Sequence, residues 1–265
     1  MKTKRLVWEN RERDLKKVKR YADPEHCFEV MYYRTDLSVH VPRVGVILET
    51  LIPYASELNI NFDPELCRSI TKYHDDPEML GYDKSHYLKL KANEMQQKLF
   101  EKEELESIEA ISRMYPLVTP EGYAYKELLL EALYKKSPES QLHSFADKYD
   151  GYCEAIHELL AGNSVFFEPV FNYERGTFGI RHEKFYMINE LFIRRFSSYN
   201  PFLDFGPINL MKYLKNGRLV GTPHTKESIL TPSGIPFYDE WKRLTVETIP
   251  KGMELLTKQK EFHTM

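Results

Sequence analysis

The stretch SITKYHDDPEMLGYD, Ser69–Asp83, contains the pattern from which we predict the fold. It begins as an amphipathic run and ends in acids: His74 and Asp75 are adjacent, and Glu78 and Asp83 follow. We expect a helix that ends near Asp75, because a proline comes soon after and disfavours helical geometry in the residue before it. At such an end two neighbouring side chains can turn toward one point. The stretch is therefore either a solvated acidic loop or half of a metal site.

Length and composition indicate a globular protein. The chain has 265 residues, of which 42% are hydrophobic and 29% are charged, and its formal net charge is -3. This length allows one large domain or a core with an appendage. The net charge excludes a whole-molecule basic field of the kind that binds nucleic acid or anionic membranes.

Cysteine usage and hydropathy predict the compartment. The cysteines number three, are far apart and form no Cys-x-x-Cys pair, so we expect a reducing environment rather than a disulfide framework. The first residues, MKTKRLVWENRERDLKKVKRY, lack the apolar segment of a signal peptide. The sequence contains no apolar run of about 18 residues, the length that spans a bilayer. We therefore expect a cytoplasmic protein that does not enter the membrane.

Helical periodicity dominates the first 163 residues. Residues 41–58 place apolar side chains at helical spacing, and Pro53 should kink or shorten that helix. The next helix begins with Asp63 as N-cap and Pro64 at its first position. Further helices are expected over residues 86–114, after Pro120, and from Ser137 to Gly162.

The composition changes after Asn163. Aromatic residues mix with turn residues, a further helix is expected over 183–196, and residues 198–240 are rich in Pro and Gly. We therefore predict an all-α protein: a helical bundle followed by a C-terminal extension of mixed helix and loop.

Imidazole and carboxylate side chains on separate helices suit a divalent transition metal. His74 and Asp75 are too few to hold an ion, so other helices must supply ligands. His40 lies at the start of one predicted helix, where a cap or surface role is the simpler interpretation. Asp147 lies within another, where Asp150 three residues later competes with it. An aspartate in the middle of a helix has low helix propensity, and a bound metal would compensate its burial.

Three short motifs resemble the HD-domain metal-dependent phosphohydrolases, and among them the bacterial 5′-deoxynucleotidase-like branch. They are RTDLSVHVPRVGVI, HDDPEMLGYD and FADKYDGYCEAIHELLAGN. The resemblance covers roughly residues 30–205. It implies an N-terminal helical segment over 1–29, the HD domain over 30–205, and an extension of unknown role over 206–265.

The resemblance implies a set of site residues. His40, His74, Asp75 and Asp147 would hold one divalent cation (Mn, Co, Fe, Ni or Zn), which selects Asp147 over Asp150. Glu78 would orient or deprotonate the attacking water, and Asp83 would act on the leaving oxygen or the sugar. Two basic residues, Arg34 and Lys89, would meet the phosphate charge. The implied activity is removal of phosphate from nucleoside 5′-monophosphates by a metal-activated water.

The chain also departs from the family pattern. The family usually has an acid directly before the first ligand histidine, where this chain has Val39. The branch carries an Arg-Trp-like pair upstream that contacts the nucleotide, whereas DPEHCFEVMYY, residues 23–33, has neither residue.

These departures leave alternatives open: a nucleoside triphosphohydrolase, or an inactive HD-domain protein that senses nucleotides. The partner expected is a small-molecule nucleotide. Nucleic acid and membrane are not expected, and a homodimer is expected from the resemblance alone.

Overall fold

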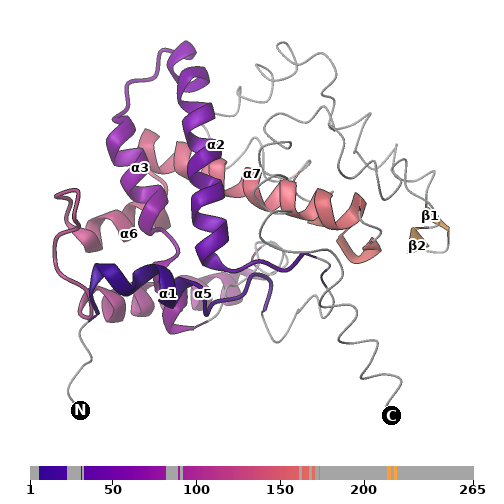
Figure 1. Ribbon diagram of the computed structural model, residues 1–265, viewed down its shortest axis with the longest axis horizontal. Coiled ribbons are helices and arrows are strands. Elements are labelled where there is room, and N and C mark those ends of the chain that lie inside the picture. The colour runs from indigo at the N-terminus through magenta and orange to yellow at the C-terminus, as the bar shows by residue number, and fades with distance from the viewer. Residues whose placement is uncertain are drawn as a thin grey trace.

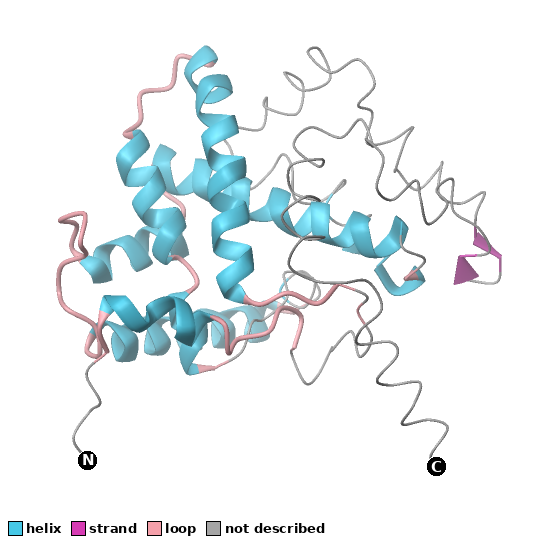
Figure 2. Cartoon of the chain, in the orientation of Figure 1, coloured by secondary structure: helices cyan, strands magenta, loops and turns pink. Residues whose placement is uncertain are grey.

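The structure is a computed structural model that describes most of the first 173 residues. The described residues are 6–22, 31, 33–81, 89, 92–160, 163–166, 169–170 and 173, together with the backbone of 214–215 and 218–219. Within this part the chain is helical, which confirms the all-α prediction (Figures 1 and 2). The predicted helix over 183–196, the loops of 198–240 and the extension over 206–265 lie almost wholly outside the described residues.

Three helices form the centre of the domain: α2 (Leu37–Glu57), α3 (Pro64–Tyr73) and α7 (Pro138–Leu160). Each packs against the other two, and Figure 1 shows α2 crossing α7 with α3 beside it. Apolar residues of α2 and α7 make up the larger core cluster, which includes Ile47, Leu51, Phe145 and Ile156. This three-way packing brings the N-terminal turn of α2, the C-terminal end of α3 and the middle of α7 to one place.

Helix α2 begins earlier than the sequence pattern predicts. Asp36 is its N-cap, and the Asp36 carboxylate accepts hydrogen bonds from the backbone N–H of Ser38 at 3.2 Å and from its hydroxyl at 2.6 Å. His40 therefore lies inside the first turn of α2 and not before it. Pro53 was expected to kink or shorten the helix, and it does not shorten it, because α2 continues to Glu57. Pro53 lies on the exposed face, where a carbonyl without an intrahelical partner can bind water.

The helices α3 and α7 begin where their capping residues predict. The Asp63 side chain accepts a hydrogen bond from Glu65 N–H at 2.9 Å, and Pro64 follows it at the first helical position. Ser137 Oγ accepts from Ser140 N–H at 3.1 Å at the start of α7. Local capping chemistry thus sets both starts.

A second core cluster joins α3 to α5 (Glu94–Ser112) and α6 (Tyr125–Tyr134). The first residue of α5 lies well inside the range 86–114 predicted for it, and Asn93 forms a capping box with Gln96 there. Trp8 stacks on Tyr115 with ring centroids 4.5 Å apart and meets Tyr125 edge-on. This aromatic contact fixes the N-terminal residues against α5 and α6.

The remaining elements are short. They are the 3-10 helices η1 (Trp8–Asn10), η2 (Asp76–Leu80) and η3 (Ser164–Phe166), the helix α1 (Arg11–Leu15), and the antiparallel pair β1 (Leu214–Lys215) and β2 (Arg218–Leu219). Residues 8–20, which belong to the N-terminal segment expected to be helical, thus form only η1 and α1 before a series of turns. None of the described helices is both long and apolar enough to cross a membrane.

Candidate metal centre

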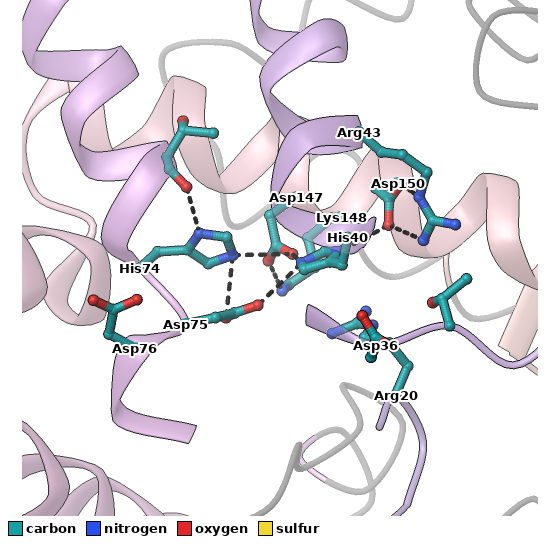
Figure 3. Close-up of polar contacts among 12 residues, drawn as sticks. Arg20, Asp36, His40, Arg43, His74, Asp75, Asp76, Asp147, Lys148 and Asp150 are labelled. Carbon is teal, nitrogen blue, oxygen red and sulfur yellow. Dashed lines mark hydrogen bonds and ion pairs between the residues drawn. The ribbon is translucent and has the colours of Figure 1, made fainter. Parts of the chain in front are cut away.

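Four side chains from three helices converge on one point at the centre of the domain (Figure 3). His40 comes from the first turn of α2, His74 and Asp75 from the end of α3, and Asp147 from the middle of α7. One ligand atom each of His40, His74 and Asp147 lie within 4.8 Å of one another. Asp75 joins them, since its carboxylate oxygens lie 3.1 Å from His40 Nε2 and 3.1 Å from His74 Nε2.

The end of α3 orients His74. The helix ends at Tyr73 and His74 is its C-cap, so the side chain can turn back along the helix. His74 Nδ1 lies 2.8 Å from the Thr71 carbonyl oxygen, which can only accept a hydrogen bond, so Nδ1 carries the proton. Nε2 then presents its lone pair to the point where Asp75 and Asp147 meet.

His40 is oriented by a buried ionic network. His40 Nδ1 lies 2.7 Å from Asp150 Oδ2, and Arg43 donates to the same carboxylate from Nε at 2.8 Å and from Nη2 at 3.0 Å. The carboxylate fixes the proton on Nδ1 and directs His40 Nε2 toward Asp75 and Asp147. Sequence spacing left Asp147 and Asp150 as rival ligands; in the structure Asp147 faces the two histidines and Asp150 supports His40.

The four side chains fit a divalent cation. His40 Nε2, His74 Nε2 and Asp75 Oδ2 are buried, and no described group outside the four side chains forms a hydrogen bond with them. His40 Nε2 lies 3.1 Å from an oxygen of Asp75 and 3.3 Å from an oxygen of Asp147. His74 Nε2 lies 3.1 Å from Asp75 and 3.8 Å from Asp147. Adjacent ligands of an octahedral ion with bonds of about 2.1 Å lie about 3.0 Å apart. Two imidazoles and two carboxylates suit a first-row transition metal, and an ion would satisfy all three buried atoms.

The nearby carboxylates raise the pKa values of both histidines in the cluster. Burial lowers the pKa of His74, but the carboxylates of Asp75 and Asp147 outweigh it and raise that pKa to about 9. Burial and Arg20 lower the pKa of His40, and Asp150 and Asp147 raise it well above its ordinary value. Without an ion the carboxylates are thus neutralised by protons on the two histidines, and a bound metal would replace those protons.

A cavity of about 330 Å³ opens beside the cluster, with His74, Asp75 and Asp147 in its wall. Glu78 of η2 lines the same cavity, and its backbone N–H donates to the Asp75 carbonyl at 3.0 Å. Lys89 also lines it, in an ion pair of 3.3 Å with Glu104 of α5. The structure therefore places Glu78 and Lys89 in the lining of the cavity that His74, Asp75 and Asp147 also line.

The other two expected residues are not placed there. Asp83 lies outside the described residues. Arg34 is not among the residues that line the cavity, and its Nη1 donates to the carbonyl oxygens of Arg20 and Tyr21 at 2.9 and 3.1 Å. Its contact with the cavity is thus indirect, through the segment that those two residues form.

Arg20 and Tyr21 themselves line the cavity, and the sequence reasoning missed them. The Arg-Trp-like pair was expected within residues 23–33, where it is absent. An arginine and an aromatic residue, Arg20 and Tyr21, are adjacent just before that range. Arg20 N–H donates to the Thr35 carbonyl at 3.1 Å, and Arg20 Nε lies 3.6 Å from Glu154 of α7. The adjacent basic and aromatic residues were the available signal, and only the fold shows that they reach the site.

An all-α domain that gathers a histidine, a His-Asp pair and an aspartate from three helices defines the class of HD-domain metal-dependent phosphohydrolases. The chain belongs to the YfbR-like 5′-deoxynucleotidase family, whose model matches residues 11–190. The matched range includes all four proposed ligands, and it ends before the extension over 206–265.

Comparison with solved structures gives a conserved hypothetical protein from Pyrococcus furiosus. It is 23% identical to this chain, with a TM-score of 0.45, and the match covers 62% of this chain and 91% of that one. No curated protein matches the chain.

Proposed function

We propose that this protein is a metal-dependent phosphohydrolase that removes phosphate from nucleoside 5′-monophosphates. One observation carries the proposal: His40, His74, Asp75 and Asp147 turn donor atoms toward one point in the wall of a cavity. Membership of the YfbR-like family supports a nucleotide substrate of the 5′-deoxynucleotidase kind. Two imidazoles and two carboxylates suit a divalent cation as cofactor, and several transition metals fit these ligands.

The metal, when bound by the four ligands, would neutralise phosphoryl charge and lower the pKa of a coordinated water. The chain's own residues hold and orient the reactants. Glu78 is assigned to accept the proton of the attacking water, since it lines the cavity one turn beyond His74 and Asp75. Asp83 remains the residue proposed to act on the leaving oxygen or the sugar.

Cations of the cavity wall complement the phosphate. Lys89, which pairs with Glu104 of α5, is assigned to this role, and Arg20 adds a guanidinium to the lining of the same cavity. A guanidinium can contact two phosphate oxygens at once, and an ammonium acts as a point charge. Arg34 is proposed to act by holding the backbone of Arg20 and Tyr21.

The test is a phosphate-release screen over ribo- and deoxyribonucleoside mono- and triphosphates. Each would be assayed with Mn²⁺, Co²⁺, Ni²⁺, Mg²⁺ or EDTA, and Asp75→Ala and Glu78→Ala proteins would run alongside. We expect inorganic phosphate from monophosphates, only with metal, and none from either variant.

The same screen separates the alternatives. Release of triphosphate from nucleoside triphosphates would identify a triphosphohydrolase. Absence of any product from a protein that binds metal and nucleotide would contradict the hydrolase and favour a nucleotide sensor.

A further inference from the structure

Three lysines line the cavity beside the metal centre, and the account above assigns a role to only one of them, Lys89. They are Lys89, Lys135 and Lys148. Lys148 forms an ion pair with Asp147, and Lys89 pairs with Glu104. Among the residues that the structure describes, none forms a hydrogen bond or an ion pair with the Lys135 ammonium. Lys135 is thus the cavity lysine that no described side chain contacts through a direct ion pair.

The position of Lys135 is fixed by the backbone. It is the C-cap of α6, in the left-handed region with φ 54° and ψ 39°, and its N–H donates to the Glu131 carbonyl at 3.0 Å. Glycine or asparagine is the usual residue in this conformation, and another L-residue costs about 1 kcal/mol there. A lysine at this position is therefore not explained by the turn that it forms.

The surroundings of Lys135 disfavour its charge in the absence of a ligand. The side chain is partly buried in the cavity wall, and its charged neighbours include Lys148 and Lys89 as well as Asp147 and Glu104. Burial and the two like charges prevail and lower the pKa of Lys135 to about 7. An anion in the cavity would reverse this balance, since it would attract all three ammonium groups.

We propose that Lys135 is a substrate-binding residue whose ammonium group binds the phosphoryl group of the substrate beside the metal centre. The inference rests on the proposed function and adds a residue to it. Because Lys135 lines the same cavity as the proposed ligands His74, Asp75 and Asp147, the anion that we assign to it is the phosphate beside the metal centre. The ligand class is a phosphate monoester dianion, or the inorganic phosphate that its hydrolysis releases.

The neighbouring residue provides a matched control. Lys136 is exposed, and its ammonium lies 5.1 Å from the centroid of the Tyr134 ring on the outer surface. Lys135→Met and Lys136→Met remove the same charge from adjacent positions, one in the cavity wall and one outside it. Lys135→Arg keeps a cation at the site and tests for rescue.

The experiment is titration calorimetry of the Mn²⁺-loaded full-length protein with inorganic phosphate, together with kcat and KM for a nucleoside monophosphate. We expect Lys135→Met to weaken phosphate binding and raise KM by at least about tenfold, Lys135→Arg to recover part of the loss, and Lys136→Met to stay within about twofold of the wild type. Manganese stoichiometry should remain one per chain in all of them. The Tm of Lys135→Met without phosphate should equal or exceed that of the wild type, because the charge removed is unfavourable there.

The outcomes separate the two proposals. If the wild type releases phosphate from nucleotides but Lys135→Met keeps its phosphate affinity and KM, the role of Lys135 is overturned and the hydrolase stands. If no nucleotide is hydrolysed but phosphate binds in a Lys135-dependent way, the hydrolase fails and the role of Lys135 stands. If the metal-loaded wild type binds no phosphate, the inference about Lys135 is wrong.

Discussion

At the scale of single residues, Asp150 supports one of the proposed metal ligands without facing the ligand atoms itself. Its carboxylate holds His40 on Nδ1 and is itself held by Arg43. All three side chains are buried, so the proton arrangement of His40 cannot be set by solvent. The affinity of the site for metal should therefore depend on Asp150 almost as strongly as on a ligand.

Replacement of Asp150 by asparagine tests this dependence. We expect Asp150→Asn to weaken Mn²⁺ binding by about 10- to 100-fold, because the amide no longer fixes the His40 tautomer. Asp76→Asn is the control, since Asp76 is an equally buried, arginine-paired carboxylate with no hydrogen bond to a proposed ligand. Calorimetric titration with Mn²⁺ measures both, and equal affinities in Asp150→Asn and the wild type would refute the supporting role.

A second prediction at this scale separates catalysis from metal binding. Glu78→Gln should lower kcat by about 10²- to 10⁴-fold, the usual contribution of a general base, and leave the metal stoichiometry unchanged. Glu103→Gln is the matched control, because Glu103 lines the same cavity from α5. A Glu78→Gln protein with wild-type kcat would show that another group accepts the proton.

At the scale of elements, a buried ion pair connects α1 to η2. Arg11 Nε lies 2.8 and 2.9 Å from the two Asp76 oxygens, and Tyr125 donates to the same carboxylate at 2.8 Å. Burial raises the pKa of Asp76, although Arg11 and Tyr125 oppose that rise. The pair thus ties the N-terminal residues to the turn that follows the metal ligands.

Removal of one partner should be strongly destabilising. We expect Arg11→Met to lower the free energy of unfolding by about 3–5 kcal/mol, because it leaves the Asp76 charge buried without its partner. Arg13→Met, at an exposed position of the same helix, should change it by less than about 0.5 kcal/mol. Urea denaturation of both variants provides the measurement, and similar midpoints would contradict this account of the pair.

Helix α7 carries a glycine that makes room for the cavity wall. A Cβ at Gly151 would overlap the hydroxyl of Tyr173, which lines the cavity, and would lie 2.9 Å from its Cζ. Gly151→Ala should therefore displace the Tyr173 ring and raise KM several-fold, even though alanine favours a helix interior by about 0.5–1 kcal/mol. The test is the KM of Gly151→Ala, of Tyr173→Phe and of the double variant that combines them. Because Tyr173→Phe removes the hydroxyl, the double variant should have a KM nearer the wild type than Gly151→Ala has.

The elements also show what the sequence could predict. The starts of α3 and α7 follow from Asp63, Pro64 and Ser137, because capping depends on a few neighbouring residues. The start of α2 was placed too late, since the apolar pattern begins at residue 41 although Asp36 is the cap. Pro53 was misjudged because tertiary packing of α2 against α3 and α7 outweighs the loss of one hydrogen bond.

At the scale of the whole molecule, a bound metal should stabilise the folded state in addition to its role in catalysis. The ion would join α2, α3 and α7, and it would satisfy donor atoms that are otherwise buried without partners. At a free metal concentration of 100 times Kd, linkage adds about 2.7 kcal/mol, which corresponds to a rise in Tm of about 5–10 °C. Thermal unfolding with Mn²⁺ and with EDTA should show this rise in the wild type and not in Asp147→Ala.

Only some of the residues that meet at the candidate site could be predicted from the sequence. The motifs around His40, His74 and Asp147 led to the three helix positions that the structure brings together. Lys135 has no motif of its own, and the adjacent pair Arg20 and Tyr21 is a weak signal, since all three reach the cavity through turns between helices whose direction depends on the packed fold. The domain boundaries and the homodimer stay predictions.

The most direct test of the central claim is the anomalous difference density of a crystal grown with Mn²⁺ or Co²⁺ and recorded at the absorption edge of the ion. The account predicts one peak per chain, about 2.0–2.3 Å from His40 Nε2, His74 Nε2 and one oxygen each of Asp75 and Asp147. A crystal of metal-saturated protein with no peak at this point, or with its ion held by other residues, would contradict it.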